Sequence, residues 1–199
     1  MKTNLLLAVF VMFTAFASAQ KMKVESGDFS FLKGQSELKV EFSFDKATFY
    51  NEKMSEQEYI EKRVKEISAD KGQGEADKWL TDWKHSKENT FAEKFISSFN
   101  KNVDVVASQD ASSTYTLIVE TTWIYPGWFA GVMKQPAKVS TQLKFVETAN
   151  PSNVLLVINS EKAPGDGNFV GVANNNDRIA EGYAKTGKSL AKMIDKKAK

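Results

Sequence analysis

The stretch GYAKTGKS, residues 182–189, holds every fixed position of the phosphate-binding pattern G-x-x-x-x-G-K-[ST]. In nucleotide-binding proteins these residues form a loop between a strand and a helix N-terminus, and backbone N–H groups hold the phosphates. Here no strand pattern leads into Gly182. Residues at helical spacing run through the motif: Ile179, Tyr183, Gly187, Leu190 and Ile194. We therefore expect one continuous helix that contains Gly182, Gly187, Lys188 and Ser189, and no nucleotide or other cofactor.

A second candidate is a calcium loop that begins at Asp166. Oxygen-bearing side chains follow at several positions of a twelve-residue loop, but the fifth position is Val170 and the twelfth is Asp177 rather than glutamate. A flexible surface loop that leads into the last helix accounts for the segment better. We expect no metal site there.

Other catalytic arrangements lack their residues. His85 is the only histidine and cysteine is absent, which excludes zinc sites of the His/Cys type and leaves Ser-His-Asp catalysis dependent on His85. We expect His85 on the surface of a helix. Four acidic residues fall among lysines on one predicted helix and indicate an ordinary solvated face: Glu56, Glu58, Glu61 and Glu66. A pair of distant carboxylates, as in a hydrolase, stays open.

The segment WIYPGWF, residues 123–129, is the best binding candidate. Four aromatic residues surround a Pro-Gly bend at the end of a predicted strand: Trp123, Tyr125, Trp128 and Phe129. Such side chains can stack on a sugar, enter a membrane interface or anchor a partner protein. They can equally cap the end of the sheet as part of the core.

The N-terminus is typical of a secretory signal peptide. Lys2 is followed by an apolar run, Leu5 to Phe13, and by the small-x-small sequence Ala17-Ser18-Ala19. We expect cleavage between Ala19 and Gln20, and a periplasmic or secreted protein with no transmembrane segment in the mature chain. The remaining 180 residues (199 minus 19) suit a single domain, and their nearly balanced charge does not indicate a nucleic-acid partner.

The periodicity of the rest predicts the supporting elements. Residues 20–37 have no clear period and are expected to form an irregular lead-in to one domain that spans residues 38–199. Strands are predicted over 38–44, 103–106, 115–124, 139–145 and 154–158, the last of them buried on both faces. Leu117, Val119, Thr121 and Trp123 share one face of their strand, whereas Ile124 belongs to the other.

Helices are predicted over Glu56–Ser68, over Glu75–Asn100 and at the C-terminus. Ser55 and Glu58 form a capping box before the first, and Trp79 and Trp83 lie on an apolar stripe of the second that we expect in the core. The order of elements predicts an α+β domain, with about four or five strands in an antiparallel-rich sheet and three helices mainly on one face.

Most of residues 38–195 resembles a family of uncharacterised secreted proteins of Gram-negative bacteria. The segments that carry the resemblance are LKVEFSFD, DKWLTDWKHSKENTFAEKFISSFNK, YTLIVETTWIYPG, AKVSTQLKFVETANPSNVL, KAPG and DRIAEGYAKTGKSLAKMI. The element order is more loosely similar to the N-terminal module of TolB and to CsgG-like modules of envelope lipoproteins. This resemblance implies a role in envelope assembly rather than catalysis, although the lipid-anchor cysteine of those modules is absent.

These observations favour an exported, non-enzymatic domain that binds another envelope component, either a protein or a glycan. Two alternatives remain: an exported hydrolase that uses carboxylates on glycans or peptides, and a carrier of a small apolar ligand between helices and sheet. No catalytic residue is assigned.

Overall fold

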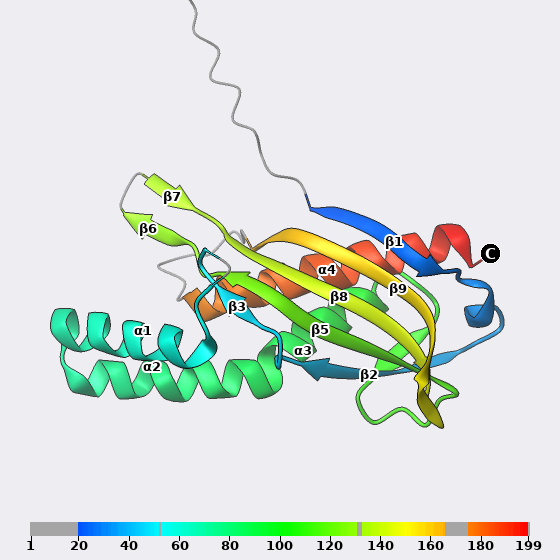
Figure 1. Ribbon diagram of the computed structural model, residues 1–199, viewed down its shortest axis with the longest axis horizontal. Coiled ribbons are helices and arrows are strands. Elements are labelled where there is room, and N and C mark those ends of the chain that lie inside the picture. Colours follow the sequence, from blue (N-terminus) through cyan, green and yellow to red (C-terminus); the bar gives the residue numbers. More distant parts are fainter. Residues whose placement is uncertain (1–19, 52, 131–132, 166–174, 199) are drawn as a thin grey trace, which may run out of the picture.

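The computed structural model of the chain describes residues 20–51, 53–130, 133–165 and 175–198. Within these residues the chain forms a single α+β domain, in which a mixed sheet packs against helices (Figure 1). The described sheet has seven strands in the order β1–β9–β8–β5–β2–β4, with β3 also paired to β5. The strands are β1 (Lys21–Gly27), β2 (Glu37–Ser43), β3 (Thr48–Phe49), β4 (Val106–Ser108), β5 (Tyr115–Tyr125), β8 (Ala137–Glu147) and β9 (Asn150–Gly165). Strands β6 (Trp128–Ala130) and β7 (Met133–Gln135) form a separate two-stranded ribbon.

The sheet is antiparallel on one side and parallel on the other. Strands β1, β9, β8 and β5 pair antiparallel, whereas β2 and β3 run parallel to β5, and β4 runs parallel to β2. The predicted count of four or five strands was therefore wrong, and the antiparallel description holds for only half of the sheet. The parallel pairs arise because a long helical segment between β3 and β4 returns the chain to the same end of the sheet.

The expectation of an irregular lead-in over residues 20–37 was wrong as well. Strand β1 pairs with β9 along an edge of the sheet, from Lys21 opposite Glu161 to Gly27 opposite Leu156. Met22 and Val24 pack against the core, while the alternate side chains of Lys21, Lys23 and Glu25 are charged and exposed. This short alternation of apolar and charged residues is the sequence pattern that indicates the strand. Charged residues on an edge strand also hinder its pairing with another chain.

Three helical rods are present in the described part of the chain, as predicted. They are α1 (Glu56–Lys71); α2 (Gln73–His85) continued by a π-helical turn (Ser86–Thr90) into α3 (Phe91–Asn100); and α4 (Asn175–Lys197). The capping box of α1 is confirmed, because Ser55 Oγ accepts from the backbone N–H of Glu58 at 3.3 Å and the Glu58 carboxylate accepts from the N–H of Ser55 at 2.7 Å.

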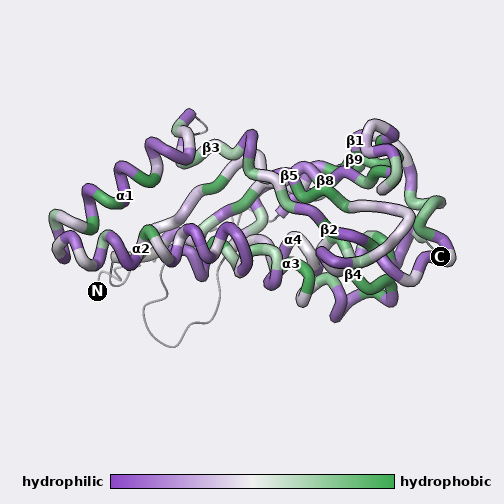
Figure 2. Tube along the Cα trace, turned by 90° about the horizontal axis from the view of Figure 1, so that it is seen from below, coloured by the Kyte–Doolittle hydropathy of each residue, from purple (hydrophilic) through white to green (hydrophobic). Residues whose placement is uncertain are grey.

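The helices do not all cover the sheet. Helices α3 and α4 lie side by side on one face, whereas α1 and α2 form a hairpin that extends beyond the end of the sheet (Figures 1 and 2). Buried aromatic rings fasten the base of this hairpin. Tyr59 stacks on Phe49 with ring centroids 4.4 Å apart, and Trp83 packs edge-on against both. Trp79 and Trp83 are buried, as expected from their position on an apolar stripe.

The residues of the phosphate-binding pattern lie inside α4, which confirms the helix predicted there. A Cβ atom on Gly187 would lie 2.4 Å from the backbone oxygen of Phe95 in α3, and one on Gly182 would lie 2.7 Å from Cγ2 of Val139 in β8. Lys188 is exposed, and Ser189 donates from Oγ to Gln20 Oε1 at 2.6 Å. The two glycines therefore allow α4 to approach both its neighbouring helix and the sheet.

We predict that Gly187→Ala lowers the free energy of unfolding by about 1–2 kcal/mol. The gain of about 1 kcal/mol in helix propensity is outweighed by the collision with the Phe95 backbone, which no side-chain rotation relieves. Chemical denaturation measures the change. Gly74→Ala in α2 is the control, because its Cβ meets nothing within 4 Å, and it should be neutral or stabilising. Equal effects of the two changes would contradict a tight approach of α4 to α3.

Candidate binding site

The face of the sheet opposite α3 and α4 is not covered by any helix in the described part of the chain. Cross-strand pairs place a row of polar side chains on it: Lys23, Asn159, Gln142 and Glu120. Strand β9, predicted to be buried on both faces, is buried on only one of them. Leu156 and Ile158 are buried on the core face, whereas Val157, which faces the open side, is only partly buried and Val154 is 47% exposed. We refer to this polar surface as the open face.

A β-bulge in β5 decides which aromatic residues reach the open face. The register jumps between Thr121, opposite Thr141, and Trp123, opposite Ser140. After the bulge Ile124 pairs with buried Val139. The predicted alternation was therefore wrong beyond Thr121: Ile124 enters the core, and Trp123 leaves it for the open face, because a bulge inserts one residue and reverses the phase.

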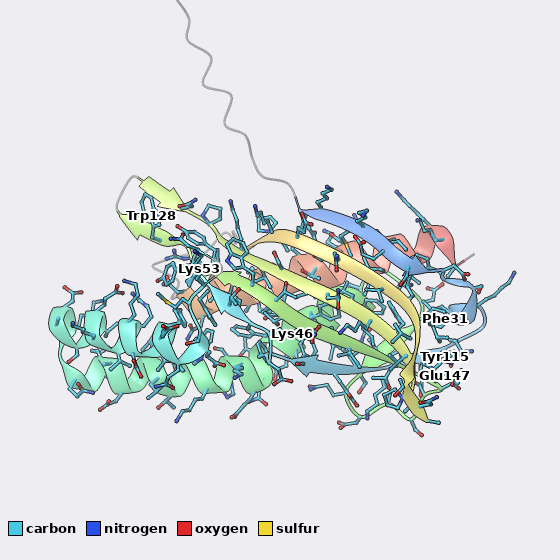
Figure 3. The ribbon with its side chains drawn as sticks, in the orientation of Figure 1. Phe31, Lys46, Lys53, Tyr115, Trp128 and Glu147 are labelled. Atoms are coloured by element: carbon cyan, nitrogen blue, oxygen red, sulfur yellow. The ribbon has the colours of Figure 1, made fainter. Side chains whose placement is uncertain are left out.

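Four aromatic side chains gather where the open face ends, and we call them the aromatic platform: Tyr50, Trp123, Tyr125 and Trp128. The rings of Trp123 and Tyr125 lie 6.1 Å apart and nearly parallel, and Tyr50 meets Tyr125 edge-on at 6.1 Å. Trp128 is 42% exposed on β6, at the end of the molecule from which the α1–α2 hairpin extends (Figure 3). The structure thus brings together three of the four residues expected from the sequence. The side chain of Phe129 lies outside the described part.

Hydrogen bonds hold the polar edges of the platform. Gln135 Oε1 accepts from Tyr125 Oη at 2.7 Å and from Trp128 Nε1 at 3.0 Å, and Trp123 Nε1 donates to the backbone oxygen of Tyr50 at 2.8 Å. Tyr50 has a φ of 52°, which is rare for a residue other than glycine, and its N–H also donates to the backbone oxygen of Ile124. Tyr50 was not predicted, because only this tertiary pairing brings it beside β5.

Two acidic residues near the platform are each matched by two cations. Glu120 accepts from Lys46 at 3.0 Å and from Lys144 at 2.9 Å, while Glu66 pairs with Lys62 and Arg63. Burial alone would raise the pKa of the Glu120 carboxyl, but Lys144 and Lys46 outweigh it and hold the pKa below its usual value. Glu120 therefore stays ionised in neutral solution.

The cations also lie close to the rings, and one of them is unpaired within the described residues. The ammonium of Lys62 lies 5.9 Å from the centroid of the Tyr50 ring. Lys138 is the cross-strand partner of Tyr125, and its side chain makes no ion pair or hydrogen bond with the described residues.

A recess that the sequence did not indicate lies beside the N-terminus of α1. Its volume is about 780 Å³, and apolar residues line one part and polar residues another. Glu56 accepts from Lys87 at 2.6 Å and from Trp83 Nε1 at 3.0 Å within this region. Lys87 belongs to the π-helical turn and lies over the ring of Phe44. The polar run before Phe91 marks this turn in the sequence but carries no sign of the recess.

The other candidate sites from the sequence, the calcium loop and His85, add no binding site to the described part of the chain. The calcium-loop residues 166–174 lie outside the described part, and among the described residues no group of three His, Asp or Glu side chains could hold a metal ion. His85 lies at the end of α2 and is exposed, next to Asn89. None of the described helices combines the length and the apolar composition that crossing a bilayer requires.

Comparison with known proteins gives only remote neighbours. No family model matches the chain, and no curated protein matches. Among solved structures, two dodecamers of PelC from Paraburkholderia phytofirmans, one of them a single-residue variant, align at 11% and 12% identity. Each alignment covers 86% of this chain and 97% of the other, with TM-scores of 0.42 and 0.41. Similarity at this level carries no argument about function.

We predict that Glu120 stabilises the fold in a pH-dependent manner. Its pKa in the folded protein lies below the usual value of 4.5, so its stabilising effect is present above that value and is lost as the pH falls through the folded pKa. The free energy of unfolding of wild type should exceed that of Glu120→Gln by up to about 1 kcal/mol at pH 7. Denaturation at pH 7 and pH 3 tests this, and a difference that grows toward pH 3 would contradict it.

Proposed function

We propose that this protein is an exported, non-enzymatic binding module and that the aromatic platform is its contact surface. The observation that carries the proposal is the exposed ring of Trp128 beside rings whose polar edges are already bonded. The N-terminal signal features support the export part of the proposal.

The platform suits binding better than a structural role as the end of the core. Ile124 occupies the core at this level of the sheet, while Trp123 and Tyr125 are only partly buried on the opposite face. Leaving part of an indole in water forgoes roughly 1 kcal/mol of hydrophobic stabilisation, which a partner would recover on contact. Rings held in place also lose little conformational entropy when they bind.

A hydrolase that uses carboxylates has less support. A general acid needs a carboxyl whose pKa is raised toward neutrality. Five described carboxyls have a clearly shifted pKa, and in all five it is lowered: Asp28, Glu58, Glu66, Glu75 and Glu120. Glu120 and Glu66 act as ion-pair acceptors rather than proton donors.

The recess beside α1 favours a second candidate function, the transport of a small ligand. Its volume of about 780 Å³ falls within the range of small-molecule sites, and Phe42, Phe44 and Ile60 supply an apolar wall. The contacts across it, chiefly the Glu56–Lys87 pair, would have to open for a ligand to reach Trp83.

We predict that Trp128→Ala removes the capture of an envelope partner without unfolding the protein. Trp128 is exposed, so the change should alter the free energy of unfolding by less than about 1 kcal/mol, whereas a central contact residue contributes about 2 kcal/mol or more to binding. Crosslinking of the tagged protein in intact cells, followed by mass spectrometry, measures capture.

Val154→Ala is the matched control, because Val154 is similarly exposed but lies toward the β8–β9 turn at the far end of the sheet. Trp128→Phe should retain most of the binding, since it keeps a ring and loses only the bond to Gln135. A reproducible partner that persists in Trp128→Ala would place the contact surface elsewhere on the molecule.

A further inference from the structure

The platform presents hydrogen-bond donors to a ligand. An indole N–H can only donate, so the Gln135 atom that faces Trp128 must be the carboxamide oxygen. The same oxygen also accepts from Tyr125 Oη, so the two donors together occupy both of its lone pairs. The Gln135 amide nitrogen, with two N–H groups, therefore points away from both rings and has no partner among the described residues.

Lys138 adds a positive charge at the same place. It lies opposite Tyr125 on the open face, and its ammonium has no carboxylate partner in the described part of the chain. The neighbouring carboxylates do not cancel it, because Glu120 and Glu66 are each held by two cations of their own. Counted over the described residues, the charge beside the rings is therefore positive, although the protein as a whole is nearly neutral.

We propose that the platform binds an acidic polysaccharide, a refinement that rests on the proposed function. The aromatic rings offer stacking surfaces for the apolar faces of sugar rings, the Gln135 amide donates to hydroxyl or ring oxygens, and Lys138 pairs with a carboxylate. Such a ligand is flat, rich in acceptors and anionic, and it matches each of these three features. On the open face, Gln142 is hydrogen-bonded to Asn159 at 3.2 Å, and these side chains offer further amide groups to a polysaccharide that extends beyond the platform.

The same residues are a poor match for insertion into a membrane. The large hydrophobic side chains exposed in the described part are Val106, Trp128 and Val154, and they come from three different strands rather than one patch. Insertion into the interface needs a continuous apolar surface. Charged and amide side chains occupy the open face next to the platform.

Isothermal titration of the purified protein with two matched sugars tests the proposal. The acidic probe is a hexamer of β-1,4-linked glucuronic acid, and the neutral probe is cellohexaose, which has the same backbone without carboxylates. We expect the acidic hexamer to bind at least about fivefold more tightly at low salt, and this preference to shrink as salt is added. Lys138→Gln should abolish the preference while leaving the weak binding of cellohexaose unchanged.

Lys188→Gln is the charge-matched control, because Lys188 is an exposed lysine on α4 and should leave both affinities unchanged. Equal binding of the two hexamers, or an unchanged preference in Lys138→Gln, would overturn the acidic ligand but not the binding surface. The acidic ligand would also be overturned if neither sugar bound and Trp128 were instead required to capture a crosslinked protein or phosphatidylglycerol vesicles. The platform would then remain the binding surface. If no probe or partner depends on Trp128, the proposed function falls with it.

Discussion

Strand β5 changes both its neighbour and its side-chain phase at one point, and the arrangement of the domain depends on this change. Up to Glu120 the strand pairs with β2, and from Trp123 it pairs with β3. The bulge between Thr121 and Trp123 lies in the gap between these two pairings. Before the bulge, Thr121 bonds Tyr183 of α4 inside the core, and after it Ile124 takes over the core position. The core therefore continues past the bulge while the aromatic side chains turn outward.

The consequence is a domain with two unlike faces. One face is closed by α3 and α4, whose close approach relies on glycines that leave room for the backbone of α3 and for Val139. The other face carries a row of polar side chains across its middle and is aromatic at one end. Among the described residues, Glu120 and Glu66 are each paired with two cations, and Lys138 beside Tyr125 adds a further positive charge. In our proposal, the geometry of the rings and the local charge together select the class of ligand that the platform recognises.

Local patterns in the sequence were sufficient for the helices but not for the whole sheet. The capping box at Ser55 and the spacing through Gly182 and Gly187 are properties of single segments, and both helices formed as predicted. Strand β3, with two residues, is too short to show a period, and the bulge in β5 leaves no mark in its composition. The aromatic cluster at 123–129 was visible as a candidate. Its partners Tyr50, Gln135 and Lys138 come from elsewhere in the chain and depend on the register.

The aromatic platform, and no other aromatic cluster, should contact the ligand. The four tryptophans of the chain provide an internal test, because Trp123 and Trp128 belong to the platform while Trp79 and Trp83 are buried at the base of the helical hairpin. Nitrogen-15-edited NMR resolves one indole N–H signal from each. On titration with the glucuronic acid hexamer, we expect shifts for Trp123 and Trp128 and none for Trp79 and Trp83. Shifts confined to Trp79 and Trp83 would contradict the platform as the contact surface and direct attention to the recess beside α1.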